Sequence, residues 1–321
     1  MRLLLLGAPQ LGGDCWHDDI AAEAKALGWD VVPDPRGRWR YPQIKAMPAD
    51  EVVKLAKDVD LLLWARTHSH NPLGDAETML RRVEDLGVVT VGLHLDLYWG
   101  MPRRELRIGA EAWWTCQHVY TADGGPRDWA CKGVRQHRWC PPAFGTRNLG
   151  RAKPAGRHRY VFFGGSVRGI HGEHRARLLD WAKRRWGSRF GWYGQATRGR
   201  KYGAELSGLV SYADVVLGDS AGVLPRCDQS WPCYWSDRVV RMMGRGAVFA
   251  HPATTGMAGQ GFDETTMIPF KRYDFKTIGE RIESMSTSER AAMRDAAVQV
   301  VADRHLWRHR LQQIAADVGL A

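Results

Sequence analysis

The sequence predicts an α/β protein built from two Rossmann-like halves, each with a sheet of parallel strands flanked by helices. Three observations lead to this prediction. Short apolar runs recur along the chain and alternate with stretches of helical length and periodicity. Several of these runs are followed at once by glycine turns, as in βα units. The length of 321 residues is sufficient for two domains, each with its own core.

The first half begins with the apolar run Arg2–Leu6, which predicts a strand followed by a glycine loop that ends at Gly13. This loop is not a GxGxxG fingerprint, so a nicotinamide site is only weakly supported and a plain βα turn is the alternative. Further strands are expected at Trp29–Val32, Val59–Ala65, Val88–Leu93, His118–Thr121 and Gln136–Trp139, and helices at Asp18–Leu27, Ala49–Lys57 and Ala76–Leu86.

The segment Gly145–Gly156 is polar, basic and rich in glycine and proline, and we interpret it as a linker between the halves. The second half then repeats the same alternation. Strands are expected at Tyr160–Phe163, Phe190–Tyr193, Val215–Leu217, Ala247–Ala250 and Pro269–Tyr273, and helices at Arg175–Trp186, Leu206–Ala213, Phe275–Met285 and Arg290–Arg304. Ser286 followed by Glu289 is an N-cap signature for the last of these helices.

Composition restricts the class of protein. No apolar run approaches the length needed to span a bilayer. The six cysteines lack CxxC pairing, which favours a reduced, cytoplasmic protein and disfavours a zinc site. A DxD motif suited to a metal is also lacking, because Asp58 and Asp60 stand at the start of a predicted strand.

The charge is strongly positive, with a formal net value of +11. The excess is concentrated in Cys131–Lys201, which holds eighteen lysines and arginines against two acidic residues, with aromatic residues between them. Such a tract suits a polyanion, and nucleic acid is the natural one. A merely solvated basic face is the alternative. The residues that we expect to bind nucleic acid are Arg135, Arg138, Arg147, Arg151, Arg198, Arg200 and Lys201.

Candidate catalytic residues follow predicted strands of the first half, at the edge where open α/β sheets bind ligands. Asp96 comes just after Val88–Leu93 in an aromatic setting, and it is our first candidate for a general base. His94 and His68 are further candidates. The alternatives are that Asp96 caps the next helix and that the loop histidines are incidental.

The stretch Tyr234–Ala250 is the most informative part of the chain. Ser236 and Asp237 form an N-cap pair before a short helix through Met243, and glycines then lead into a strand. A helix N-terminus suits an anion such as a diphosphate, and the fork of donors on Arg238 suits the same ligand. An ordinary βα unit with a salt-bridged arginine is the alternative.

This stretch resembles the donor-site helix of the CgeB-like (spore-maturation) glycosyltransferases, which are two-domain enzymes of the GT-B fold and are often phage-encoded. Their pattern S-x-R-x-x-E-x-x-x-x-G-A is matched at Ser236, Arg238, Gly246 and Ala247. It is not matched at Arg241, where the family usually has a glutamate that holds the donor ribose. The resemblance covers most of the second half and is weak in the first.

The resemblance implies roles for further residues. In GT-B enzymes the glycine loop at Gly13 would lie beside the transferred sugar. The F-x-G-S run after Tyr160–Phe163 would place backbone donors near phosphate, and the Y-G pair that ends Phe190–Tyr193 would lie near the base. An element resembling F-x-x-G-x-E would cap the donor sugar. The donor-binding residues implied in this way are Gly13, Gly164, Gly165, Ser166, Tyr193, Gly194, Asp219, Ser236, Arg238 and Glu264.

The resemblance also implies an architecture of two domains facing a cleft, with a last helix that crosses back. We expect an acceptor domain at 1–150, a donor domain at 151–300 and the returning helix at 301–321. The implied reaction transfers a sugar from a nucleotide-sugar, a UDP-sugar in our interpretation, without a tightly bound cofactor or a required metal. The expected protein is a monomer or a weak oligomer.

The acceptor we expect is the hydroxyl of a 5-hydroxymethyl-pyrimidine base in double-stranded DNA, extruded onto an aromatic ring such as that of Trp99, Trp113 or Trp139. Two alternatives stay open. One is transfer to a protein or an envelope glycan. The other is a non-catalytic nucleic-acid-binding protein on a GT-B scaffold, which the residue Arg241 favours. A nucleotide-dependent oxidoreductase is disfavoured by the missing dinucleotide fingerprint.

Overall fold

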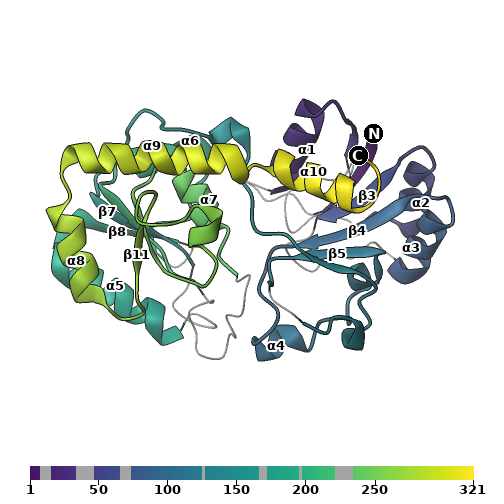
Figure 1. Cartoon of the computed structure of the whole chain (residues 1–321), viewed down its shortest axis with the longest axis horizontal. Helices are drawn as coiled ribbons and strands as arrows, with labels where there is room; N and C mark the ends of the chain where they lie inside the picture. The colour runs from purple at the N-terminus through teal and green to yellow at the C-terminus, as the bar shows by residue number, and fades with distance from the viewer. Residues whose placement is uncertain are drawn as a thin grey trace. The chain divides into compact units, whose positions relative to one another are not determined.

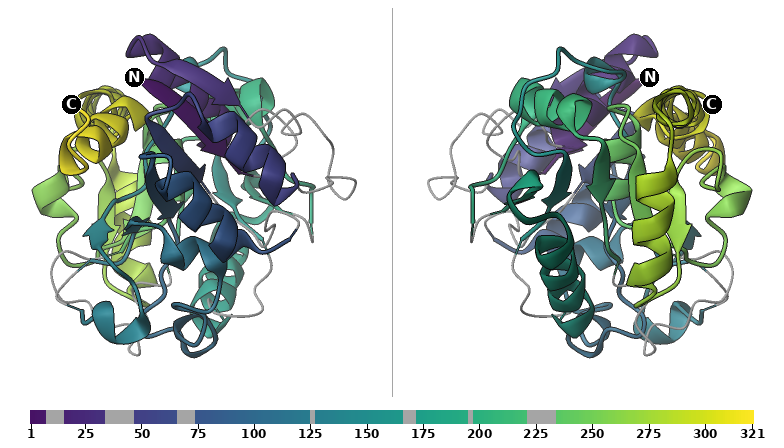
Figure 2. Two further views of the ribbon diagram at one scale, coloured as in Figure 1. Left: turned by 90° about the vertical axis from the view of Figure 1, so that its right-hand side faces the viewer. Right: turned by 90° about the vertical axis from the view of Figure 1, so that its left-hand side faces the viewer.

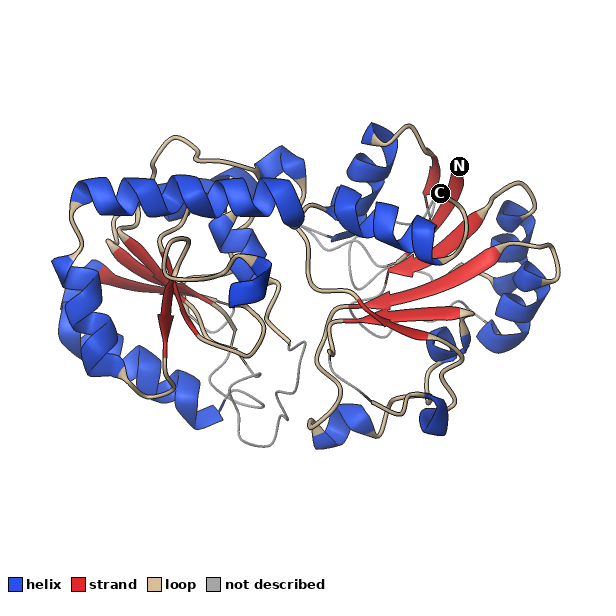
Figure 3. Cartoon of the chain, viewed as in Figure 1, coloured by secondary structure: helices blue, strands red, loops and turns tan. Residues whose placement is uncertain are grey.

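A computed structural model describes residues 1–7, 16–33, 47–65, 74–124, 127–165, 172–194, 197–220 and 234–321 of the chain. The chain divides into two compact units (Figure 1). The first contains Met1–Pro141 and Trp307–Ala321, and the second contains Pro142–Leu306. Each unit has one sheet with helices packed around it (Figure 3), which is the predicted α/β class.

The sheet of the first unit has the strand order β2-β1-β3-β4-β5-β6, and neighbouring strands are parallel. Parallel strands are covered on both faces, which explains why Leu3, Leu4 and Leu5 are all fully buried. The strands are β1 (Arg2–Leu6), β2 (Asp30–Pro33), β3 (Leu61–Ala65), β4 (Val89–His94), β5 (His118–Thr121) and β6 (His137–Trp139). The helices are α1 (Trp16–Ala26), α2 (Ala49–Ala56), α3 (Ala76–Glu84), α4 (Pro102–Glu105) and α10 (Trp307–Asp317).

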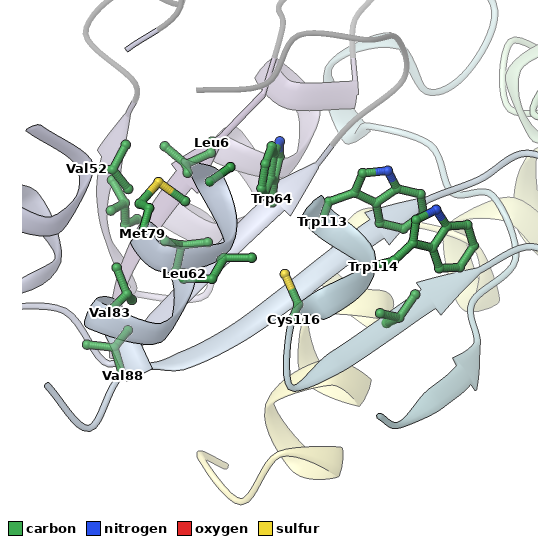
Figure 4. Close-up of a cluster of buried hydrophobic side chains, with 14 of the residues drawn as sticks. Leu6, Val52, Leu62, Trp64, Met79, Val83, Val88, Trp113, Trp114 and Cys116 are labelled. Carbon is green, nitrogen blue, oxygen red and sulfur yellow. The ribbon is translucent and has the colours of Figure 1, made fainter. Parts of the chain in front are cut away.

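The core of the first unit is formed by helices α2 and α3, the strands they cover and a group of tryptophans (Figure 4). The rings of Trp113 and Trp114 stack with their centroids 4.0 Å apart, and neither side chain is exposed. Trp113 therefore packs in the core and cannot offer a ring face to an extruded base, contrary to one of the sequence-based expectations.

The last helix, α10, packs within the first unit although the residues before it belong to the second. Arg308 forms an ion pair of 2.8 Å with Glu23 of α1, and the hydroxyl of Tyr120 in β5 donates to Asp317 over 3.0 Å. These contacts confirm the prediction that the C-terminal helix returns to the first half. The two chain ends consequently lie near each other (Figures 1 and 2).

The sheet of the second unit has the order β11-β10-β9-β7-β8, and its strand pairs are again parallel. Its strands are β7 (Tyr160–Phe163), β8 (Phe190–Tyr193), β9 (Val215–Leu217), β10 (Phe249–Pro252) and β11 (Ile268–Phe270). Its helices are α5 (Gly172–Trp186), α6 (Gly203–Tyr212), α7 (Arg238–Met243), α8 (Phe275–Ser284) and α9 (Thr287–Arg304). Ser286 caps α9 as predicted, because its hydroxyl accepts from the amide of Glu289 over 3.1 Å.

Two strands of the second unit differ from the prediction for local reasons. After α7 the backbone turns through Gly246 at φ 74°, in the left-handed region that favours glycine. The strand β10 therefore begins at Phe249 rather than Ala247, and it continues to Pro252 by pairing with β11. The strand β11 ends at Phe270, and Tyr273, which was expected in the strand, has a positive φ of 66°.

The predicted linker is tied to the second unit. The amide of Gly150 donates to the carbonyl of Gly244 over 2.7 Å, and the amide of Ala155 donates to that of Gly208 over 3.0 Å. The contacts assign the segment 142–306 to one unit, so the chain first passes between units at Pro141.

Candidate functional site

The order of the strands marks one edge of the second sheet as a ligand site. Strand β7 has β8 on one side and β9 on the other, so the chain goes from β7 to β8 and then crosses back past β7 to β9, where the direction of the strand order reverses. Open α/β sheets bind ligands at such a switch point, beyond the carboxyl ends of the strands. Phe162 of β7 pairs with Leu217 of β9. The residues just beyond these ends are Gly164 and Asp219.

A buried ion cluster occupies this switch point. The carboxylate of Asp219 is 1% exposed and accepts two bonds from Arg175, from Nε over 2.9 Å and from Nη2 over 3.1 Å. Nη1 of Arg238 donates to the same carboxylate over 3.0 Å and to the backbone oxygen of Asp219 over 3.2 Å. Both guanidinium groups also lie over the ring of Phe162, at 5.6 Å and 5.5 Å from its centroid.

Within the described part of the chain, two guanidinium groups of the cluster donate to one carboxylate, that of Asp219. Burial lowers the pKa of Arg175, and the charge of Asp219 opposes that shift. A site of this kind, with fixed cations in a protein interior, is suited to an anion that arrives from solvent.

Arg238 is held at one end and available at the other. Its Nη1 is fixed by Asp219, while Nη2 lies 3.5 Å from the position where a Cβ would stand on Gly164. Within the described part of the chain, Nε and Nη2 of Arg238 donate to no acceptor. Two donors of one planar group therefore remain for an anion beside the turn that follows β7.

The backbone amide of Gly164 was predicted to donate to a phosphate, and the structure gives it a different partner. The amide of Gly164 donates to the carbonyl of Tyr193 over 2.9 Å, so it is not a donor for phosphate. Its carbonyl oxygen lies 1.8 Å from where a Cβ would stand on Gly194. Only glycine permits the ends of β7 and β8 to approach so closely. Among the described residues, no atom lies within 4 Å of the position where a Cβ would stand on Gly165.

The amino end of α7 also differs from the prediction. Helix α7 has only six residues, and its first amide, that of Arg238, donates to Oγ of Ser236 over 3.2 Å. The amide of Val239 donates to the carbonyl of Ser236 over 2.9 Å. Because both amides are used inside the turn, the side chain of Arg238 is the anion ligand that this helix offers.

The other described residues that were predicted to bind the nucleotide-sugar do not belong to the ion cluster. Tyr193 is buried and its hydroxyl bonds to Nδ1 of His158 at 2.7 Å. Burial raises the pKa of Tyr193. Glu264 is exposed in the connection between β10 and β11, and it is not a member of the ion cluster. Gly13, Ser166 and His68 lie outside the described residues. Arg241 forms an ion pair with Asp237 at 3.5 Å, one turn back along α7.

Residues at the carboxyl edge of the first sheet form a second group. His94 ends β4 and is buried, with its ring stacked 5.4 Å from that of Trp113. Asp96 is one-third exposed and lies 3.9 Å from Nδ1 of His94 and 3.3 Å from Nη1 of Arg104. Asp96 does not cap a helix, since α4 begins only at Pro102. The carboxylate is therefore accessible but already shared with a cation.

Asp123, at the end of β5, is the carboxylate that the sequence did not reveal. It is 2% exposed and accepts the amides of Tyr98 and Trp99 at 2.9 Å and 3.0 Å. Burial raises the pKa of Asp123 to about 7, against the effect of these bonds. Its role in the structure is to fix the turn after β4 that carries Tyr98 and Trp99.

The residues expected to bind nucleic acid are distributed over both units. Arg135 forms two bonds to Glu84, and Arg138 lies 3.8 Å from Asp317, both in the first unit. The second unit holds the others, of which Arg147, Arg151, Arg198 and Arg200 are exposed and Lys201 is paired with Glu205 at 2.6 Å. The tract that is continuous in sequence is thus divided between two units, and several of its charges are neutralised within the protein.

Sequence reasoning missed Arg175 and His251 in the second unit. His251 of β10 is fully buried beside the cluster, and burial lowers its pKa to about 4. Arg175 reaches Asp219 from a helix 44 residues away in sequence. The sequence offers one weak signal for Arg175, namely that it is an arginine at the start of the predicted helix after the glycine turn.

Neither a metal site nor a membrane-spanning helix is present among the described residues. No group of three or more histidine, cysteine or acidic side chains there has the arrangement of a metal site. None of the helices in the described ranges combines the length and apolarity needed to cross a membrane.

Comparison with known proteins relates this geometry to one class of enzyme. Residues 165–316 match a protein-family model described as glycosyl transferase-like. The solved structures that resemble the chain include an alpha-glucosyltransferase in complex with UDP-glucose and DNA containing an abasic site. Its TM-score is 0.63 at 11% identity, covering 98% of this chain and 99% of that one. A second similar structure is an alpha-glucosyltransferase in complex with UDP and a 13-mer DNA containing an HMU base. Its TM-score is 0.66 at 11% sequence identity, and the match covers 97% of this chain and 98% of that chain.

A third similar structure is that of HepE from Anabaena in complex with UDP and glucose. Its TM-score is 0.60 at 12% identity, with 100% of this chain and 99% of that chain covered. No curated protein matches the chain in sequence. The likeness extends over nearly the whole of each chain, and it shows that the fold is the GT-B fold of these glycosyltransferases.

Proposed function

We propose that this protein is a glycosyltransferase that moves a sugar from a nucleotide-sugar, a UDP-sugar, to an acceptor hydroxyl. The observation that carries the proposal is the ion cluster at the switch point of the second unit, where Arg238 presents two unused donors beside the glycine turn. The family model that matches 165–316 supports it, because this range contains the whole cluster. UDP or UDP-glucose accompanies the similar structures, which supports the choice of nucleotide.

In this proposal the diphosphate of the donor binds Arg238, and Gly165 borders it. The acceptor oxygen forms a bond to the anomeric carbon while the bond from that carbon to the diphosphate breaks. The electron pair of the breaking bond goes to the departing nucleoside diphosphate, whose charge Arg238 stabilises. The proton of the acceptor hydroxyl goes to a base, and Asp96 is our candidate because it is accessible, with His94 beside it.

We propose further that the acceptor is a 5-hydroxymethyl-pyrimidine base in DNA, modified in the cytoplasm of an infected or producing bacterial cell. The net charge of +11 supports a polyanionic acceptor. The DNA present in two of the similar structures supports the same acceptor class. The narrower resemblance to the CgeB-like family, through Ser236, Arg238, Gly246 and Ala247, is part of this proposal.

Transfer to a hydroxymethylated base has a direct test. The protein is incubated with UDP-sugars or GDP-sugars and with duplex DNA that carries 5-hydroxymethylcytosine or 5-hydroxymethyluracil. The DNA is then digested to nucleosides, which are weighed by mass spectrometry. We expect a nucleoside heavier by one sugar residue with one UDP-sugar. Release of UDP without a heavier nucleoside would keep the transferase and exclude DNA as acceptor, whereas the absence of both donor binding and turnover would refute the proposal.

One observation favours a second candidate function, a non-catalytic nucleic-acid-binding protein. Arg241 stands where the resembling family has a ribose-binding glutamate, and its charge is paired with Asp237. Under this alternative, DNA binds with strong salt dependence and no UDP-sugar stabilises the protein against heat. A thermal-shift series with UDP, UDP-sugars and DNA separates the two candidates.

A further inference from the structure

The turn that follows helix α4 of the first unit exposes a leucine. Leu106 is 82% exposed, and the only other large hydrophobic side chain that is exposed in the described ranges is Leu86, at 46%. The amides of Arg107, Ile108 and Ala110 continue the helical bonding beyond α4, over 2.9, 3.2 and 3.1 Å. Ile108 is buried and anchors this turn. The exposure of Leu106 is thus a fixed feature of the fold.

Two cations flank Leu106. Arg103 stands three residues before it, on the same side of the helical turn, and Arg107 follows it directly in the chain. Both arginines are exposed, and neither has a carboxylate partner among the residues that the structure describes. Glu105 between them is used within the turn, because its carboxylate accepts the amide of Gly100 over 3.2 Å. The turn therefore presents an exposed apolar side chain with two exposed arginines near it in the chain.

A second segment adds cations and an aromatic ring. The backbone at Gly109 packs against Lys132, whose carbonyl oxygen is 2.2 Å from the would-be Cβ of that glycine. The ammonium of Lys132 lies 5.7 Å from the ring centroid of Trp99, and the guanidinium of Arg127 lies 5.9 Å from it. The α4 surface, as we name it, consists of Trp99, Arg103, Leu106, Arg107, Arg127 and Lys132.

The α4 surface lies at the carboxyl edge of the first sheet. Helix α4 follows β4, and the segment with Lys132 follows β5 (Figure 1). This is the edge at which His94 and Asp96 stand. Asp123 makes the surface rigid, since its buried carboxylate holds the backbone of Trp99. A ligand on the α4 surface would therefore lie beside the candidate base on a preformed platform.

The combination of features identifies the kind of ligand. The exposed guanidinium groups of Arg103 and Arg107 and the ammonium of Lys132 suit the phosphates of a nucleic acid. An isolated, protruding leucine near the two arginines in the chain suits insertion between base pairs, the means by which DNA-deforming proteins unstack a step. One leucine offers little area for a lipid surface. We propose that the α4 surface binds duplex DNA and that Leu106 enters the base stack beside the nucleotide that is extruded.

This inference rests on the proposed function, in which a base in DNA is the acceptor. DNA binding and base unstacking can nevertheless be measured without any nucleotide-sugar. The probe is a duplex with 2-aminopurine next to 5-hydroxymethylcytosine, since 2-aminopurine brightens when its neighbour is unstacked. Affinity is measured at several salt concentrations for the wild type, for Leu106→Ala and for the double variant Arg103→Ala, Arg107→Ala. Leu86→Ala and Arg81→Ala are matched controls, because both residues are exposed on the first unit away from α4.

We expect the double variant to lower the slope of log affinity against log salt by about 1.8, since each lost phosphate contact removes about 0.9. Leu106→Ala should keep the slope and abolish most of the fluorescence rise. Both controls should match the wild type. An unchanged slope in the double variant, an unchanged fluorescence in Leu106→Ala, or binding to anionic vesicles instead of duplex DNA would each overturn the inference.

Titration of UDP in the same preparations separates this inference from the proposed function. Normal UDP binding with failed α4 predictions would overturn the α4 surface alone. Failed UDP binding with the expected α4 results would remove the transferase and leave the DNA surface in place.

Discussion

Replacing Arg238 by alanine tests the donor site, and the structure allows its effect on folding to be separated from its effect on binding. The variant leaves Asp219 with both bonds from Arg175, so the buried carboxylate keeps a cation. What is lost from the fold is one charge-assisted pair and the contact with Phe162. We expect the free energy of unfolding to fall by about 1–2 kcal/mol, which leaves a folded protein for measurement.

The loss in donor binding should be larger. Arg238 has two donors left for a diphosphate, and a hydrogen bond to a charged group contributes about 1.5–3 kcal/mol. If one to two such bonds are lost, the binding free energy falls by about 1.5–6 kcal/mol, and the middle of this range, about 2–4 kcal/mol, is our expectation. This corresponds to a dissociation constant for UDP raised about 30- to 700-fold, at about 1.4 kcal/mol for each factor of ten. The UDP affinity of Arg238→Lys should lie between those of the wild type and Arg238→Ala, because lysine keeps the charge but not the planar fork of donors.

Isothermal titration with UDP measures the effect, and Arg159→Ala is the matched control. Arg159 also makes two bonds to one carboxylate, that of Asp214, but at the amino end of β7. Its removal should cost less stability than that of Arg238, because the Arg159 side chain is 47% exposed, and it should leave UDP affinity unchanged. Equal UDP affinity in Arg238→Ala and wild type would refute the placement of the diphosphate, and equal losses in both variants would mean that destabilisation alone explains the effect.

Three further predictions concern the two sheets. Asp219→Asn removes the buried carboxylate that accepts from both guanidinium groups, so chemical denaturation should show a free energy of unfolding lower by about 3–5 kcal/mol, a larger loss than for Arg238→Ala; an equal or smaller loss would contradict the importance of this ion cluster. The raised pKa of Asp123, about 7 against an ordinary 3.8, means that its contribution to stability is complete below about pH 4 and disappears as pH rises through 7. Asp123→Asn should therefore remove a decline of up to about 4 kcal/mol between pH 4 and 8, and unfolding curves that keep their pH dependence would contradict this. Gly194→Ala places a methyl 1.8 Å from the carbonyl oxygen of Gly164, so both stability and UDP affinity should fall, and a wild-type melting temperature would be inconsistent with this approach of the strands.

The fold was accessible from the sequence because its strongest signals are local. Leu3–Leu6 and Tyr160–Phe163 are continuous apolar runs, and both form buried parallel strands. The cap at Ser286 needs only residues three apart. Strand ends were less accessible, because β10 extends to Pro252 through pairing with β11, a partner that no local pattern specifies.

The candidate site was accessible only in part. Arg238 stands in a recognisable helix start, and it was identified from that pattern. The pairing of Arg175 with Asp219 was not, because the two residues come from different elements and meet only when the sheet has formed. For the same reason, counting charges along the sequence does not identify which cations are available to a nucleic acid. Such counts cannot show that Arg135 is neutralised by Glu84 or that Arg103 is left without a carboxylate within the described chain.

The central claim is that a donor diphosphate binds at the switch point of the second unit. A crystal structure of the protein with UDP tests it most directly. We predict a diphosphate oxygen within hydrogen-bonding distance of the Arg238 guanidinium, next to Gly165, with Arg238 still bonded to Asp219. A diphosphate bound elsewhere, with the guanidinium of Arg238 making no contact to it, would contradict this placement of the donor.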